Sequence, residues 1–389
     1  MDLKKPNINI LNEDLVFLDR IDYYTSLWFK RHWRECSTFE FHLSEWVPGL
    51  ALGQRIMLDA DGERSGIIET IEFDDYDLKD ITVSGRCMRS LLKARNILPT
   101  AAGYDTYNTN IEDIMHGLVD KNAANPTKAG RKYPNLVMAA SGHRGDTTSY
   151  QSTYGVLMDE LTKLSELSQI GTRVILDYAG KKLRFETAIG VDRTYNNSGG
   201  NGWAIFSQKF SNVEKRVLTQ SIADYRNMAY VAGQGEEADR EVVLLGDELT
   251  GYDRREVYVD ARDIGKDSDV TLADRGKAKL AEYPKVSSYQ ASVDPSGYKT
   301  SWDLGDFVSI LDTELGIQQD QQIISVKEAW EKDGATLEVE FGSPLKTIYQ
   351  AIKRDTAVQT ATTKGPPGTD GKTPTFHVGE DGHLYATYN

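Results

Sequence analysis

The sequence predicts a mainly β protein that also contains α+β modules. Period-two alternation of apolar and polar residues recurs in short segments before residue 84 and again between residues 306 and 341, which is typical of strands. Between them lie segments with apolar residues at helical spacing, and glycine recurs at every third position from 365 to 371. The 389 residues exceed what one hydrophobic core supports, about 250–300 residues, so several domains are expected.

The N-terminal stretch, from Leu15 to about Val83, is predicted to consist mostly of strands. Its clearest alternating runs are Thr38–Leu43, Arg55–Asp59 and Gly66–Phe73. The sequence Asp59-Ala60-Asp61-Gly62 predicts a hairpin turn between the last two runs, because Asp and Gly accept the positive φ angles of such turns. Short strands at this spacing are typical of a small barrel or sandwich.

Two segments with helical pattern follow these strands. Ser84–Arg95 is expected to be a strand that continues as a short helix, with Leu91 and Leu92 on its buried side. Asn108–Asn122 predicts a second helix, because its apolar residues fall on one face. Ala123–Asp146 is rich in Gly, Pro, Asn and Lys, which predicts a loop or an irregular insertion.

The clearest helix is predicted at Tyr154–Gln169, with Gly171 as its stop signal. A hairpin of Thr172–Asp177 and Lys182–Glu186 follows it, so helix and hairpin form a small α+β module. The leucines that define the helix recur at spacings of three and four: Leu157, Leu161, Leu164 and Leu167.

Beyond a flexible connection at Asn196–Gly202, more strands and one helix are predicted. Thr271 opens the helix with capping-box character, and the helix runs to Tyr283. The expected strands are Ala204–Phe206, Asn227–Ala232, Glu241–Leu245, Arg254–Val259, Asp306–Ile310, Gln322–Val326 and Thr336–Phe341.

The C-terminal segment has a different composition. Gly365–Thr373 carries glycine at every third position with prolines between, which fits a short collagen-like triple helix and equally a Gly/Pro linker. Leu345–Lys353 is expected to form a helix, and Thr375–Tyr388 to form two short strands around a turn.

The net charge of −14 argues against a protein that binds nucleic acid through phosphate contacts, because such binding needs a basic surface. The longest apolar runs fall far short of the roughly 18 residues of a spanning helix. The polar N-terminus lacks a signal sequence, and Cys36 and Cys87 are too few for a disulfide framework, so synthesis in the cytosol is expected.

No catalytic, cofactor-binding or metal-binding residue is predicted, and no cofactor. The carboxylates of Asp59–Glu63 are better explained by a hairpin turn than by a calcium loop. Those of Asp260–Asp269 could hold a cation, and a polar loop before a capped helix explains them equally well. Arg144-Gly145-Asp146 matches an integrin-type tripeptide and is assigned no function. No two histidines have the spacing of a His-x-His or His-Glu-x-x-His metal site. The six histidines are His32, His42, His116, His143, His377 and His383.

Two alternatives stay open. The cluster of Asp74, Asp75 and Asp77 would serve a cell-wall glycosidase or peptidase only if folding placed two carboxylates at the required separation. A carbohydrate-binding receptor protein would use exposed aromatic residues as stacking platforms, although core packing explains them better. The tryptophans considered for this role are Trp28, Trp33, Trp46 and Trp203.

The order of elements over Leu15–Lys353 resembles the tail-tip hub proteins of siphophages, in the ReqiPepy-type siphovirus tail protein family, which are similar in fold to contractile-phage baseplate hubs. The resemblance rests on Ser84–Arg95, Tyr154–Glu186, Thr271–Tyr283 and the strand entry Leu304–Val308. It implies two small β-barrel domains that form a ring, with lateral α+β domains between them. The corresponding boundaries are a first barrel at 1–95, lateral domains at 96–200 and 201–284, a second barrel at 285–353, and a collagen-like linker with a hairpin at 354–389.

The function implied by this resemblance is structural rather than enzymatic. A homotrimeric hub would cap the tail tube, adapt a sixfold tail to a threefold tip, and open for DNA passage during infection. Its partners would be the distal tail ring protein, the tube or tape measure, and receptor-binding or fibre proteins, with DNA only passing through and no membrane anchor. It would act in the virion after assembly in the cytoplasm of the host, and its carboxylates would line the channel and repel DNA.

Overall fold

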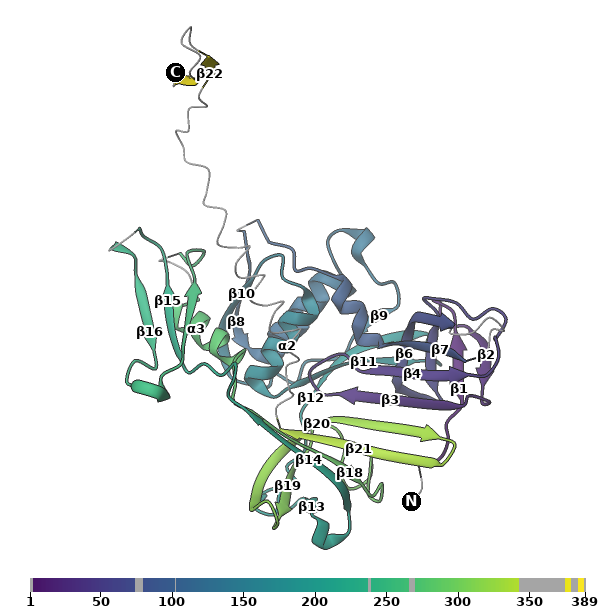
Figure 1. Cartoon of the computed structure of the whole chain (residues 1–389). Coiled ribbons are helices and arrows are strands. Elements are labelled where there is room, and N and C mark those ends of the chain that lie inside the picture. Colours follow the sequence, from purple (N-terminus) through teal and green to yellow (C-terminus); the bar gives the residue numbers. More distant parts are fainter. Residues whose placement is uncertain are drawn as a thin grey trace. The chain divides into compact units, whose positions relative to one another are not determined.

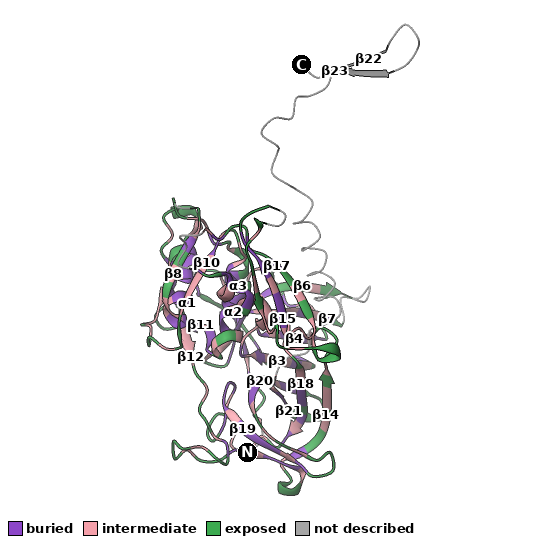
Figure 2. Cartoon of the chain, turned by 90° about the vertical axis from the view of Figure 1, so that its left-hand side faces the viewer, coloured by how far each residue is buried: buried purple, intermediate pink, exposed green. Residues whose placement is uncertain are grey.

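The computed structural model describes residues 3–73, 80–101, 103–236, 239–265 and 270–342, and the backbone of residues 375–378 and 384–387. The chain divides into two units, Met1–Pro344 and Leu345–Asn389, and each is described by itself. Within the first unit, buried residues follow the strands and helices, and exposed residues gather in the loops (Figure 2). The predicted mainly β fold is confirmed.

The N-terminal strands form around a core of stacked aromatic rings. In β3 and β4, buried residues alternate with half-buried ones, as the sequence pattern predicts. Phe39 stacks on Phe29 and Phe41 at ring-centroid distances of 6.2 and 6.4 Å. The strands are β1 (Ile8–Leu11), β2 (Phe17–Ile21), β3 (Ser26–His32), β4 (Thr38–Leu43), β5 (Arg55–Leu58), β6 (Asp61–Phe73) and β7 (Ile81–Cys87).

A second group of strands comes from residues 205–342 and has its own core. Phe341 packs against Phe206 and Tyr289, with ring-centroid distances of 4.9 and 6.1 Å. The strands are β13 (Ile205–Phe206), β14 (Val213–Ser221), β18 (Val286–Val293), β19 (Phe307–Asp312), β20 (Ile317–Glu331) and β21 (Gly334–Gly342), with a short 3₁₀ turn η4 (Gln208–Phe210) before β14.

The two groups belong to one sheet, in the order β14-β18-β21-β20-β3-β4-β7-β6-β5-β1-β2, with β19 and β13 branching from β20. The link is an antiparallel ladder in which Trp28 lies opposite Ala329 and Arg31 opposite Val326 (Figure 1). The expectation of two barrels is therefore wrong in one respect: no barrel closes within the described residues. The reason is that β3 and β20 pair with each other, which leaves β2 and β14 as edges.

The first α+β module lies between these groups in the sequence. Its helices α1 and α2 pack on one another. Asn110 is the N-cap of α1, and its side chain accepts a hydrogen bond from the Asp113 N–H. Its elements are η1 (Met88–Ala94), β8 (Asp105–Asn110), α1 (Ile111–Val119), the π turn η2 (Asp120–Ala124), η3 (Ala129–Arg131), β9 (Leu136–Met138), β10 (Thr147–Ser152), α2 (Leu157–Ser168), β11 (Gly171–Asp177) and β12 (Lys182–Ala188).

Three details of this module differ from the expectation. Helix α2 ends at Ser168, and the next residue, Gln169, turns the chain with a φ of 62°. Gly171, the predicted stop signal, instead begins β11. Leu167 is exposed, because it lies outside the stripe that faces the core. The segment Ala123–Asp146 is not only loop: its strand β9 pairs in parallel with β12.

A smaller module follows, in which α3 covers a three-stranded sheet of order β16-β15-β17. The capping box predicted at Thr271 is confirmed, with Asp274 as its second member. Close packing of helix on sheet uses Gly276, where a Cβ would lie 2.6 Å from Val231. The elements are β15 (Met228–Ala232), β16 (Val242–Leu245), η6 (Gly251–Asp253), β17 (Glu256–Asp260) and α3 (Leu272–Ala281).

The second unit contains the predicted C-terminal strands. β22 (Thr375–Val378) and β23 (Leu384–Thr387) pair antiparallel, which confirms the hairpin. The predicted helix Leu345–Lys353 and the collagen-like segment Gly365–Thr373 lie outside the described residues.

Candidate functional site

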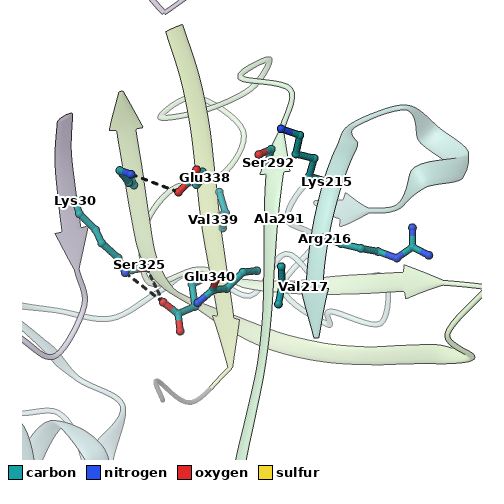
Figure 3. A pocket seen from close by; sticks show the side chains of 12 residues that line it. Lys30, Lys215, Arg216, Val217, Ala291, Ser292, Ser325, Glu338, Val339 and Glu340 are labelled. Atoms are coloured by element: carbon teal, nitrogen blue, oxygen red, sulfur yellow. Dashed lines mark hydrogen bonds and ion pairs between the residues drawn. The ribbon is translucent and has the colours of Figure 1, made fainter. Parts of the chain in front are cut away.

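The polar face of the sheet carries a groove of about 220 Å³ where β3, β20, β21, β18 and β14 lie side by side (Figure 3). Strand alternation creates it: Val339 faces the core, while its neighbours Glu338 and Glu340 face the groove. Lys30 and Lys327 reach it from β3 and β20. The groove therefore joins residues of both strand groups on one surface.

Ion pairs and hydrogen bonds fix the groove floor. Lys30 Nζ lies 3.5 Å from Glu340 Oε2, and Lys327 Nζ lies 3.8 Å from Glu338 Oε2. Glu340 also accepts hydrogen bonds from the hydroxyls of Ser288 and Ser325, at 3.0 and 3.1 Å. Because these bonds hold its oxygens, Glu340 of β21 connects this strand to β3, β20 and β18.

Charges of both signs line the groove. Lys215 is exposed and has no ion-pair partner among the residues that the structure describes, whereas Arg216 contacts Asp312 and Glu314 at 2.6 and 2.5 Å. Such a surface can hydrogen-bond to a polar partner through its lysine, serine and glutamate side chains. Over the described ranges, no group of His, Cys, Asp or Glu is arranged to hold a metal ion.

The sheet ends on both sides in edge strands with exposed apolar side chains. Within the described residues, β2 pairs only with β1, and β14 pairs only with β18. Phe17 and Leu18 on β2 are 44% and 48% exposed, and Val217 on β14 is 57% exposed. A second hollow, of about 760 Å³, flanks β14 and includes Leu218 and Leu315. Unpaired edges of this kind are templates for strands of another chain.

Beneath the groove, a buried ion network joins the two strand groups. Arg31, whose side chain is 2% exposed, contacts Asp303 and donates to the Tyr298 hydroxyl at 2.8 Å. That hydroxyl in turn donates to Glu328 Oε1 at 2.6 Å, and Arg64 Nη1 lies 2.7 Å from Glu328 Oε2. Removing one partner from such a network would leave an uncompensated buried charge, which is strongly destabilising. The network therefore favours the one arrangement of the two strand groups in which all its members are paired.

Asp61 shows the strength of this network. Burial alone would raise the pKa of its carboxyl, but Lys299 and Arg64 outweigh burial and lower the pKa to about 2. Asp59 has a φ of 50° at the turn between β5 and β6, so the predicted hairpin is confirmed. Asp61 and Glu63 extend from this hairpin into the network rather than toward a cation.

The other residues considered from sequence lie apart. Asp74, Asp75 and Asp77 are outside the described residues. Arg144 of the Arg-Gly-Asp tripeptide is held by Glu112 at 2.6 Å. In the acidic segment that begins at the end of β17, Asp260 contacts Arg240 and Arg262, and Asp263 contacts Arg275. Asp267 and Asp269 of this segment lie outside the described residues.

The tryptophans have different environments. Trp33 is a core residue, 3% exposed, as core packing predicts. Trp28 is half-buried on the polar face and donates to Glu40, and Trp46 packs on Phe73 with ring centroids 5.2 Å apart. Trp203 is 68% exposed, so core packing does not explain it.

The fold defined by this sheet and its modules is that of prophage tail proteins. The chain matches the 43 kDa tail protein of prophage MuSo2 from Shewanella oneidensis with a TM-score of 0.53 and 14% identity, over 87% of this chain and 97% of that one. The tail protein from Neisseria meningitidis MC58 gives a TM-score of 0.54 and 14% identity over the same shares. Prophage tail protein gp18 from Listeria monocytogenes EGD-e gives 0.51 and 10%, over 91% and 99%.

The family follows from the sequence itself. The chain belongs to the siphovirus ReqiPepy6 Gp37-like proteins, whose family model matches residues 7–343. This confirms the resemblance drawn from the order of elements. No curated protein sequence matches the chain. In the part of the chain that the structure describes, no helix is long and apolar enough to cross a membrane.

Proposed function

We propose that this protein is a structural hub of the siphophage tail tip, which caps the tail tube, adapts a sixfold tail to a threefold tip and opens for DNA passage. The observation that carries the proposal is one sheet made of two strand groups, each with its own core and joined at β3 and β20. Among the described residues, this sheet ends in the edge strands β2 and β14. Membership in a siphovirus family supports it.

The proposed hub is a homotrimer. Two β units per chain give six units in three chains, which matches sixfold symmetry above and threefold symmetry below. A head-to-tail contact between β2 of one copy and β14 of the next is heterologous, and it makes a closed ring when the rotation between copies closes. The exposed Phe17, Leu18 and Val217 at these edges would then be covered.

The parts of the chain have separate roles in this proposal. Residues 1–95 form one ring unit, and residues 285–353 form the other together with β13 and β14, which pair with its strands. Residues 96–200 and 201–284 are lateral modules that contact receptor-binding or fibre proteins. Residues 354–389 are a collagen-like linker and a hairpin, whose three copies would meet in the trimer.

The role is mechanical, and no catalytic step is assigned to the chain. Its partners are the distal tail ring protein, the tube or tape measure and peripheral fibre proteins, and its place is the virion after assembly in the host cytoplasm. Zymography on bacterial cell wall tests the enzymatic alternative: a clear band that Asp75→Ala abolishes would contradict a purely structural role.

The trimer is tested by native mass spectrometry of the full chain, with variants at the edges. Leu18→Lys and Val217→Lys place a charge on β2 and β14, and lysine is a residue by which natural edge strands resist pairing. We expect wild type to be a trimer and both variants to be monomers with unchanged circular dichroism. Leu167→Lys, on the exposed side of α2, is the matched control and stays trimeric. A monomeric wild type at high concentration, or edge variants that remain trimeric, would contradict the proposal.

A further inference from the structure

The two cysteines of the chain, far apart in the sequence, lie next to each other in the fold, and both are free thiols. Cys36 lies in the loop between β3 and β4, and Cys87 is the last residue of β7. The β4–β7 ladder ends with the pair Thr38 and Arg86. Just beyond it, the Cys87 N–H donates to the Ser37 carbonyl at 2.8 Å. Cys36 is therefore the chain neighbour of the residue opposite Cys87.

This backbone geometry suits a disulfide bond. Opposite residues of antiparallel strands have Cα atoms about 4.5–5.5 Å apart, and one residue along a strand adds a displacement of about 3.4 Å. Together these values place the Cα atoms of Cys36 and Cys87 about 6 Å apart, which is a usual Cα distance in disulfides. Cys36 precedes β4, so strand alternation does not turn its side chain away, and the two thiols share a hydrogen bond.

The two thiols differ in reactivity. The hydrogen bond from Cys36 lowers the pKa of the Cys87 thiol, and the nearby Arg89 guanidinium lowers it further, against the effect of burial. The same hydrogen bond, together with burial, raises the pKa of the Cys36 thiol well above its usual range. Cys36 is thus the donor and Cys87 the acceptor. Because the thiolate is the nucleophilic form of cysteine, Cys87 is the member that reacts first.

We propose that Cys36 and Cys87 are a redox-sensitive pair, which a small peroxide converts into a disulfide bond between the β3–β4 loop and β7. The oxidant must be small, because Cys87 is only 7% exposed. The Cys87 thiolate attacks one oxygen of hydrogen peroxide, the O–O bond breaks, and Cys87 becomes a sulfenic acid, oxidised by two electrons. The hydroxide that leaves takes up the proton that Cys87 had released.

The second step forms the bond. The sulfur of Cys36 attacks the sulfur of Cys87, so that an S–S bond forms and the S–O bond breaks. The departing hydroxide takes the proton of the Cys36 thiol. In total, two thiols and one hydrogen peroxide give one disulfide and two water molecules.

The disulfide would close a loop of about 50 residues, and loops of this length gain substantial stability from a cross-link. It would secure the first strand group directly beside β3, the strand that pairs with β20. Thiols stay reduced in a cytoplasm, whereas disulfides persist outside the cell. In the proposed virion protein the bond would therefore form after release from the host. This timing rests on the proposed function, but the bond itself does not.

The test treats the full chain with hydrogen peroxide and compares it with a sample kept in a thiol reductant. Peptide mapping by mass spectrometry without reduction should find the peptides of Cys36 and Cys87 joined, with the loss of two hydrogen atoms. Reduction should separate them. The oxidised chain should unfold at a midpoint about 3–6 °C higher, because the bond restricts the unfolded chain.

Two variants are the controls. Cys36→Ser lacks the second thiol, so dimedone should trap its Cys87 as the sulfenic acid. The double variant Cys36→Ser, Cys87→Ser reports any change that peroxide causes elsewhere, for example at methionines, and its midpoint should not rise.

Three results would overturn the proposal: two thiols that stay free in peroxide, a disulfide between two copies of the chain, or oxidation to sulfinic acid without a cross-link. An internal disulfide that leaves the midpoint unchanged would contradict its stabilising role. If the variants unfold, the cross-link in wild type decides alone, and it does so whether or not the protein forms a hub.

Discussion

At the scale of single residues, His32 makes the fold sensitive to acid. Burial, with help from Lys30 and Arg89, lowers the pKa of His32 to about 3, from about 6.5 in an unfolded chain. Between these values the unfolded chain binds a proton that the folded chain excludes, so stability is complete above pH 6.5 and falls as the pH drops. At pH 5 the loss from this one side chain is about 2 kcal/mol, at about 1.4 kcal/mol per pH unit.

His32→Gln should therefore flatten the pH dependence of stability, as measured by urea unfolding at pH 7.5, 6.0 and 5.0. His143 is the matched control, because its hydrogen bond with Asp113 raises the pKa of its imidazole. A raised pKa contributes stability at low pH that disappears as the pH rises, so His143→Gln should change the profile in the opposite sense. Parallel profiles for wild type and His32→Gln would show that His32 does not carry the acid sensitivity.

At the scale of elements, the segment just before β19 passes close to the indole ring of Trp33, which follows β3. Gly305 has a φ of 96°, and a Cβ there would lie 2.2 Å from the indole ring. Gly305→Ala should cost about 3 kcal/mol, since strain in the left-handed region adds to overpacking. Gly316→Ala isolates the strain, because Gly316 has a φ of 65° and open space around it, and should cost about 1 kcal/mol. Equal losses in chemical denaturation would mean that Trp33 moves aside freely.

The elements that could be predicted from sequence are those whose pattern is local. The alternation of Thr38–Leu43 gives the bounds of β4, and the Thr271 capping box gives the start of α3. β14 was missed because Val213–Ser221 carries charges where a buried strand would carry apolar residues, which is natural for an edge.

The candidate site had no such local signal. The ladder between β3 and β20 joins residues nearly 300 positions apart, and the groove is assembled from five strands on both sides of this ladder. Each lysine or glutamate in it looks, by itself, like a solvated strand residue. Sequence spacing also could not reveal that the two strand groups share one open sheet. Apolar and polar residues alternate with period two in the strands of an open sheet and of a closed barrel alike.

At the scale of the whole molecule, the net charge of −14 can be tested against the proposed passage of DNA. The polar sheet face is not uniformly acidic, because Lys30 and Lys327 each pair with a glutamate in the groove. We expect the paired charges to keep duplex DNA from binding, so that wild type shows no change in fluorescence anisotropy of a labelled duplex at 50 mM salt.

Glu338→Lys should reverse this behaviour. It removes the partner of Lys327 and adds a positive charge beside it, while Lys215 already lies unpaired in the described part of the same groove. Binding should appear at 50 mM salt and weaken steeply by 200 mM, with a log–log slope of about 0.9 for each phosphate contact. Asp159→Lys makes the same charge change on the exposed side of α2 and should bind no DNA. If both variants bind equally, net charge alone sets the affinity; if wild type binds tightly, this face is unsuited to let DNA slide past.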